Sequence, residues 1–110
     1  MIISAKNNIL NIGGEKIELE HNIETVIQFD RCCIVLFSDD KFSIKNNISA
    51  YDFQGNKLWQ ISEIIPFKFE EVYIYLSKMG DTQFITASYN GIRYTVDVIT
   101  RQVISKQIIK

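Results

Sequence analysis

Three copies of one short fragment decide the fold: Asn7-Asn8-Ile9, Asn46-Asn47-Ile48 and Asn90-Gly91-Ile92. The first two copies begin 39 residues apart, and the last two begin 44 residues apart. Each copy leads into a strand-like segment, a turn and a second strand-like segment. A repeat of roughly 40–45 residues is the length of one four-stranded propeller blade. The spacing therefore predicts a chain built from blade-like units.

Short segments rich in β-branched and aromatic residues follow one another at intervals of about 8–12 residues, as in all-β proteins. Glycine-containing turns such as Gly13-Gly14 and Gln54-Gly55-Asn56 separate them. Segment 67–79 could be a helix, but its alternation of aliphatic and tyrosine residues fits a strand better. The expected strands are 2–4, 9–12, 16–20, 24–29, 32–38, 48–53, 57–61, 71–76, 83–88, 92–98 and 102–109.

The 110 residues are expected to form one all-β domain, residues 1–110. Residues 24–61 and 71–109 would each form a four-stranded unit, and residues 2–20 an incomplete one. Pro66 would lie at the crossing between the two complete units. A closed propeller needs at least four blades, or roughly 160 residues. The sequence therefore predicts an antiparallel meander of about two and a half propeller-like units, forming an open sandwich or half-barrel.

Composition excludes several classes of protein. A net charge of −1 argues against a general nucleic-acid binder, although residues 1–40 carry −4 and residues 41–110 carry +3. The longest apolar run, residues 32–37, is far shorter than the roughly 20 residues of a membrane helix. The N-terminus lacks the pattern of a signal peptide. Two adjacent cysteines make no disulfide framework, so we expect a reduced, cytoplasmic protein.

One hairpin resembles a known repeat. Residues 48–61, ISAYDFQGNKLWQI, match the hairpin of quinoprotein-type β-propellers at Ala50, Asp52, Gly55, Leu58 and Trp59. Residues 94–103 form a weaker copy that keeps Asp97 but has Arg101 where the turn glycine of that family would stand. We expect the aspartate to accept backbone N–H bonds, the glycine to be left-handed and the tryptophan to cover the neighbouring sheet. The resemblance implies hairpin structure and no quinone cofactor.

No catalytic or metal-binding constellation is evident. His21 is the only histidine and sits in a polar turn. Cys32 and Cys33 lie in an apolar strand, so their side chains should point to opposite faces. The carboxylate pairs Asp39-Asp40 and Glu70-Glu71 fit a turn and a strand start better than acid–base catalysis. We therefore expect no cofactor, no metal and no enzymatic activity.

Two sets of residues are candidates for contact with a partner. Glu18 and Glu20 should share a face with Lys16, and Asp39 and Asp40 could extend it into an acidic surface; an ordinary solubilising face is the alternative. Tyr73 and Tyr75 should share one strand face, and Tyr89 and Tyr94 flank a turn beside Arg93. Tyrosine and arginine are typical interface anchors, but exposed tyrosine also caps sheet edges. No RNA-recognition signature accompanies these residues, so nucleic acid is not the expected partner. The short apolar runs likewise argue against a membrane as the partner.

In size, composition and hairpin style the chain is similar to the immunity proteins of contact-dependent and other polymorphic bacterial toxin systems. That resemblance implies a protein that binds a cognate toxin domain, often a nuclease, and occludes its active site. It assigns no residue roles. The alternative is a propeller-like structural module that self-associates to complete its sheet, and the expected state is a monomer or a homodimer.

Overall fold

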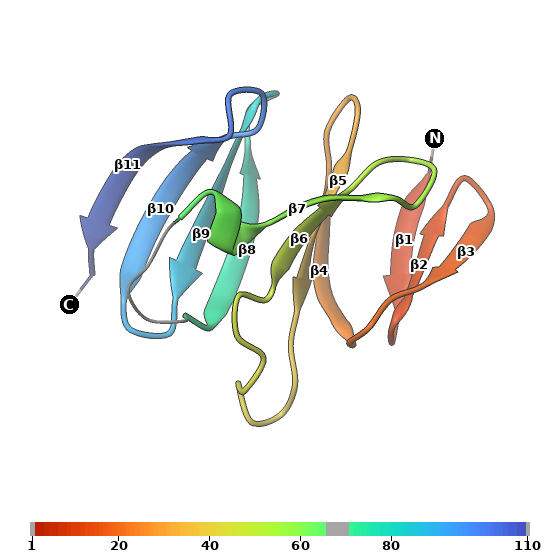
Figure 1. The fold of residues 1–110 in the computed structure, drawn as a ribbon, viewed down its shortest axis with the longest axis horizontal. Helices are drawn as coiled ribbons and strands as arrows, with labels where there is room; N and C mark the ends of the chain where they lie inside the picture. The colour runs from red at the N-terminus through yellow and green to blue at the C-terminus, as the bar shows by residue number, and fades with distance from the viewer. Residues whose placement is uncertain (1, 66–70, 110) are drawn as a thin grey trace.

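The computed structural model describes residues 2–65 and 71–109, which form three antiparallel sheets (Figure 1). The first sheet contains β1 (Ile3–Lys6), β2 (Ile9–Ile12) and β3 (Glu15–Glu18). The middle sheet contains β4 (Ile23–Gln28), β5 (Cys33–Phe37), β6 (Ile48–Tyr51) and β7 (Lys57–Gln60). The last sheet contains β8 (Tyr73–Met79), β9 (Gln83–Ser88), β10 (Ile92–Asp97) and β11 (Gln102–Ile108). Within each sheet the strands follow in chain order, so the whole is a meander.

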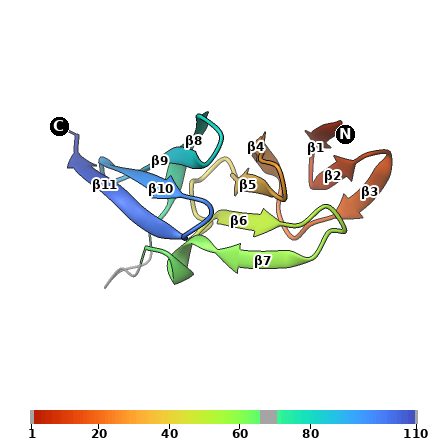
Figure 2. The ribbon, with the colours of Figure 1, turned by 90° about the horizontal axis from the view of Figure 1, so that it is seen from above.

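The three sheets stack side by side and fan outward (Figure 2). Their first strands, β1, β4 and β8, lie next to one another, while β3, β7 and β11 spread apart. The middle sheet is covered on both sides, which is why all five residues of β5 are buried. Ile34 and Leu36 pack toward the last sheet, and Cys33, Val35 and Phe37 pack toward the first. A strand buried on both faces reads as a continuous apolar run rather than an alternating one.

These observations confirm the predicted all-β fold of propeller-like units that does not close into a barrel. Each expected strand overlaps an observed one. Boundaries differ by two or more residues in four strands. β3 and β6 each end two residues early, at Glu18 and Tyr51, and β1 ends two residues late, at Lys6. β8 runs from Tyr73 to Met79 rather than from 71 to 76. A short 3-10 turn, Ile61–Glu63, was not expected. Pro66 and Glu70 lie outside the described residues.

The repeated asparagine fragments join neighbouring sheets. Asn7 and Asn46 adopt left-handed backbone conformations, with φ of 54° and 50°, which asparagine tolerates better than most residues. The buried Asn47 side chain donates to the carbonyl oxygens of Phe37 (2.6 Å) and Tyr73 (2.8 Å) and accepts from the Tyr73 N–H (2.7 Å). In the first sheet, the carbonyl of Asn7 accepts from the N–H of Ile23 at the start of β4 (2.7 Å). The repeat therefore marks where each sheet is tied to the next.

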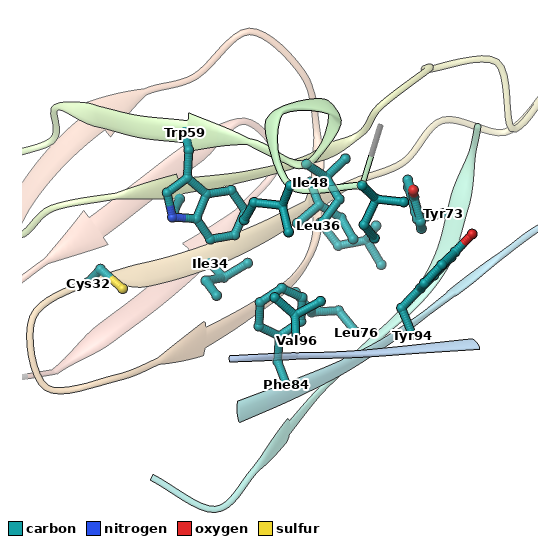
Figure 3. Close-up of a cluster of buried hydrophobic side chains, with 14 of the residues drawn as sticks. Cys32, Ile34, Leu36, Ile48, Trp59, Tyr73, Leu76, Phe84, Tyr94 and Val96 are labelled. Carbon is teal, nitrogen blue, oxygen red and sulfur yellow. The ribbon is translucent and has the colours of Figure 1, made fainter. Parts of the chain in front are cut away.

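The hairpin of β6 and β7 has the expected chemistry. The Asp52 carboxylate accepts from the N–H groups of Gln54 (3.0 Å) and Asn56 (2.8 Å), and Gly55 is left-handed at φ 89°. Trp59 stacks on Phe84 of the last sheet, with ring centroids 6.1 Å apart (Figure 3). The predicted roles of the aspartate, glycine and tryptophan are thus confirmed as structural ones.

Candidate functional site

The asparagine turns and the long β5–β6 loop lie at one end of the molecule (Figure 1). Antiparallel meanders place alternate connections at the same end, so the turns before β2, β6 and β10 gather there with the connection from β3 to β4. We call this end the turn face and define it by residues 7–8, 19–22, 38–47 and 89–91. The hairpin turns after β4, β6, β8 and β10 lie at the opposite end.

An open groove of about 630 Å³ crosses the turn face between the first and middle sheets. It brings together Glu20 and Asp39, which are far apart in sequence, and Lys45 and His21 also line it. Glu18 lies at its border, where the Asn8 amide approaches the Glu18 carboxylate at 3.5 Å. Asp40 is exposed on the adjoining loop. The groove thus gathers part of the predicted acidic surface and adds a lysine to it.

The Asp39 carboxylate organises the β5–β6 loop. It accepts hydrogen bonds from the Ser43 hydroxyl, from the Ser43 N–H (2.9 Å) and from the Lys41 N–H (3.1 Å). The Ser43 hydroxyl is the main reason why the pKa of Asp39 is lowered, because these bonds favour the charged form. The carboxylate is therefore committed to the loop's own conformation.

Phe42 is the most unusual residue of the turn face. It is 48% exposed, and its φ of 51° is a left-handed conformation that bulky residues rarely adopt. Its ring lies 5.9 Å from that of Tyr89, which is also exposed. Lys41 and Lys45 line the smaller groove, about 280 Å³, beside this aromatic pair. Sequence reasoning selected Tyr89 but missed Phe42; a lone phenylalanine inside a polar loop was the available signal.

Two of the predicted contact residues are wrong. Tyr73 and Tyr94 are each only 2% exposed and pack in the core between the middle and last sheets (Figure 3). The expectation that Tyr73 and Tyr75 share a face fails because an irregularity in the β8–β9 register lies between them. Tyr75 consequently points outward and is 48% exposed. Burial raises the pKa of Tyr94 to about 12.

Tyr75 and Arg93 share the outer face of the last sheet. Tyr75 pairs with Ala87, and Ala87 pairs with Arg93, so the three form one row across β8, β9 and β10. Strands about 4.8 Å apart place the first and third residues of such a row about 10 Å from each other. This row is separate from the turn face. The five predicted tyrosine and arginine contacts therefore do not form one surface: Tyr73 and Tyr94 lie in the core, Tyr89 lies on the turn face, and Tyr75 and Arg93 lie on the outer face of the last sheet.

The reactive residue types are placed as follows. Cys32 and Cys33 are buried and face opposite sheets, as expected. Burial raises the pKa of Cys33 to about 12, so its thiol remains protonated at neutral pH. Glu71 is buried, and its carboxylate accepts from the Asn90 amide (3.1 Å). The described residues contain no cluster of three or more potential metal ligands.

A search of the same residues for a helix long and apolar enough to cross a membrane finds none. Comparison with curated proteins and with solved structures finds no match. One family model, described as "Domain of unknown function (DUF7957)", matches residues 1–108. Because this match spans nearly all of the 110 residues, the chain belongs to the DUF7957 family.

Proposed function

We propose that this chain is a cytoplasmic immunity protein that binds a cognate bacterial toxin, a nuclease, and occludes its active site with the turn face. The proposal unites the resemblance in size and hairpin style with the surface that the fold places at one end. The protein is not an enzyme in this proposal, and its role is that of an inhibitor.

The exposed, left-handed Phe42 carries the proposal. A sparsely populated backbone conformation raises the free energy of the folded state by about 1–3 kcal/mol and is found most often at functional sites. Phe42 keeps this conformation because Asp39 holds the loop, and it presents its ring to solvent beside Tyr89. An aromatic anchor on a rigid loop loses little conformational entropy on binding. These are the properties of a side chain that inserts into a partner.

Two carboxylates in the groove next to this loop favour a basic partner; Lys45 lines the same groove, and the Lys57 ammonium lies 3.8 Å from the Glu20 carboxylate. Glu20 and Asp39 line it, and Glu18 lies at its edge. A nuclease cleft is positive because it must attract phosphates. Acidic groups opposite such a cleft raise association rates by about 10- to 1,000-fold and lose that effect in salt.

The first experiment is co-expression with the toxin domain encoded beside this gene, scored by growth rescue and by co-purification. We expect Phe42→Ala to weaken binding by about 2 kcal/mol or more, in the range of interface hot spots. Ile2→Ala, which truncates an exposed apolar side chain outside the turn face, is the matched control. Equal rescue by both variants, or a neighbour without toxin activity, would contradict the proposal.

A second experiment tests the acidic groove through association kinetics. Glu20→Gln should slow association with the toxin at low salt and leave dissociation nearly unchanged, because an exposed charge acts mainly through steering. Glu15→Gln, at the opposite end of β3, controls for net charge. An equal effect of the two substitutions would show that the groove has no specific role.

The alternative, self-association that completes a sheet, has one observation in its favour. All seven residues of β11 are exposed, including Ile104 and Ile108, and β11 is an edge strand. Two copies are not expected to stack their sheets face to face at the first sheet, because its outer face is polar. Ser4, Asn11 and Lys16 form one row on that face. Solution mass at micromolar concentration separates the two: a dimer that Ile104→Lys dissociates would favour self-association.

A further inference from the structure

A second concave site lies between the middle and last sheets, at the end opposite the turn face. Its volume is about 530 Å³, within the roughly 300–1,000 Å³ of typical small-molecule pockets. Phe29, Cys32, Trp59 and Val98 line it, and they belong to or pack against the core between the two sheets. Trp59, Phe29 and Cys32 are only 3–5% exposed, and Leu58 (39%) and Ile99 (75%) are the more exposed apolar side chains of the lining. The middle and last sheets therefore both contribute to the apolar lining of the site.

Charged side chains line the same site. Arg31 and Asp30 are neighbours in the β4–β5 turn, Arg101 comes from the β10–β11 turn, and Asp81 comes from the β8–β9 turn. Neither arginine makes an ion pair within 4 Å to any carboxylate among residues 2–65 and 71–109. Their guanidinium groups thus remain available to an anion. Arginine offers a planar fork of donors that matches a carboxylate.

Arg101 is held in a conformation that suits glycine. Its φ is 57°, and its N–H donates to the carbonyl of Asp97 (2.9 Å) to close the turn. The β6–β7 turn of the middle sheet has Gly55 at its left-handed position. An arginine there destabilises the folded state relative to glycine, and such strain is typical of residues whose side chain is used.

The charge of Arg101 reaches the buried part of the lining. Burial raises the pKa of the Cys32 thiol, and the charge of Arg101 acts in the opposite direction. Arg101 is therefore near enough to the Cys32 thiol, one of the buried lining groups, for its charge to affect that thiol.

We propose that this site binds a small-molecule carboxylate with an aromatic or branched apolar body. The apolar body would contact Leu58 and Ile99 and the accessible edge of Trp59. The carboxylate would accept hydrogen bonds from Arg101, with Arg31 as a second donor. The proposal does not depend on the proposed toxin binding, because the two surfaces lie at opposite ends of the molecule.

Trp59, the single tryptophan of the chain, reports binding by its own fluorescence. The probe is 4-phenylbutyrate, with 4-phenylbutanol and 4-phenylbutylamine as uncharged and cationic analogues. We expect a saturable change with the carboxylate and at least about tenfold weaker binding of the alcohol, since a hydrogen bond between two charged groups is stronger than one to a neutral hydroxyl. Equal binding of acid and alcohol, stronger binding of the amine, or no saturable change would each overturn the proposal.

Variants assign the carboxylate contact. Arg101→Gln should weaken binding of 4-phenylbutyrate by about tenfold or more and leave binding of the alcohol unchanged. Arg93→Gln removes the same charge from the outer face of the last sheet and should change neither. Titration calorimetry of the Trp59→Phe variant with 4-phenylbutyrate measures binding without tryptophan fluorescence. Unaltered affinity of Arg101→Gln, with the fold intact by circular dichroism, would refute the assignment.

Discussion

At the scale of single residues, Phe42 and Arg101 share one property. Both adopt left-handed backbone conformations, at φ 51° and 57°, without being glycine or asparagine. Each side chain lies at a surface site, one on the turn face and one beside the apolar pocket. A conformation that disfavours the residue present is evidence that the side chain has another use. The two residues are therefore where stability and function should oppose each other.

The first prediction follows from that opposition. Arg101→Gly should raise the free energy of unfolding by about 0.5–1 kcal/mol, since relief of left-handed strain exceeds the added backbone entropy of glycine in the unfolded chain. Urea unfolding measures the change. Thr95→Gly, inside β10, is the control and should destabilise the protein. A clear loss of stability in Arg101→Gly would mean that the arginine side chain supports the fold.

The second prediction concerns Asn47, which is 3% exposed and makes three hydrogen bonds, one to Phe37 of the middle sheet and two to Tyr73 of the last sheet. Asn47→Ala leaves three backbone groups without their partner, so we expect a loss of about 3 kcal/mol in urea unfolding. Asn22→Ala, in an exposed turn, should stay within about 0.5 kcal/mol of the parent. Similar values for the two variants would show that the asparagine fragment is not a structural clamp.

At the scale of elements, β5 is the strand on which both apolar clusters depend. Leu36 packs toward the last sheet and Val35 toward the first, and both are fully buried. The edge strand β11 is the opposite case, because all of its residues are exposed. The position of a strand in the stack of sheets, more than the residue type, determines how much an aliphatic side chain contributes to the free energy of unfolding.

The third prediction is that truncating a side chain of β5 destabilises the protein much more than truncating one of β11. Leu36→Ala should lower the free energy of unfolding by about 2–5 kcal/mol, the range for cavities in packed cores. Ile104→Ala of β11 should change it by less than about 0.5 kcal/mol. Urea midpoints of the two variants test the contrast. A large loss for Ile104→Ala in the monomer would indicate that β11 is covered in solution.

At the scale of the whole molecule, three sheets form an open fan whose two outer faces lack a further sheet (Figure 2). Both clusters between the sheets contain buried tyrosine, Tyr51 in one and Tyr73 and Tyr94 in the other. Burial raises the pKa of the Tyr51 and Tyr94 phenols to about 12. Alkali should therefore weaken both contacts between sheets.

The fourth prediction is that alkali lowers the free energy of unfolding through Tyr51. A folded-state pKa of about 12 for Tyr51, against about 10 in the unfolded chain, favours the protonated phenol in the folded state. Its contribution is fully present below pH 10 and is lost as the pH rises toward 12. Urea midpoints should thus fall across that interval, and less so in Tyr51→Phe. A midpoint that is constant across it would contradict the buried, uncharged phenol.

The local sequence pattern was sufficient to predict the strands and turns, but it was not sufficient to predict which residues form the candidate site. Alternation of side chains and turn glycines depend on neighbours in sequence, so each strand was predicted within a few residues. Tyr73 and Tyr75 were misjudged because the irregularity between them arises from pairing with β9, a long-range property. Glu20 and Asp39 were named as one possible surface, but their common groove depends on how the first and middle sheets stack.

The amino-acid sequence by itself determined that this protein is an open, all-β meander of repeated units, each marked by an asparagine fragment. The tertiary structure alone decided which aromatic side chains are buried, that Phe42 meets Tyr89, and that Arg101 lies beside Trp59 and Cys32. The physical reason is the distance along the chain over which each property is determined. Backbone conformation follows from adjacent residues, whereas exposure and juxtaposition follow from how separate sheets pack against one another.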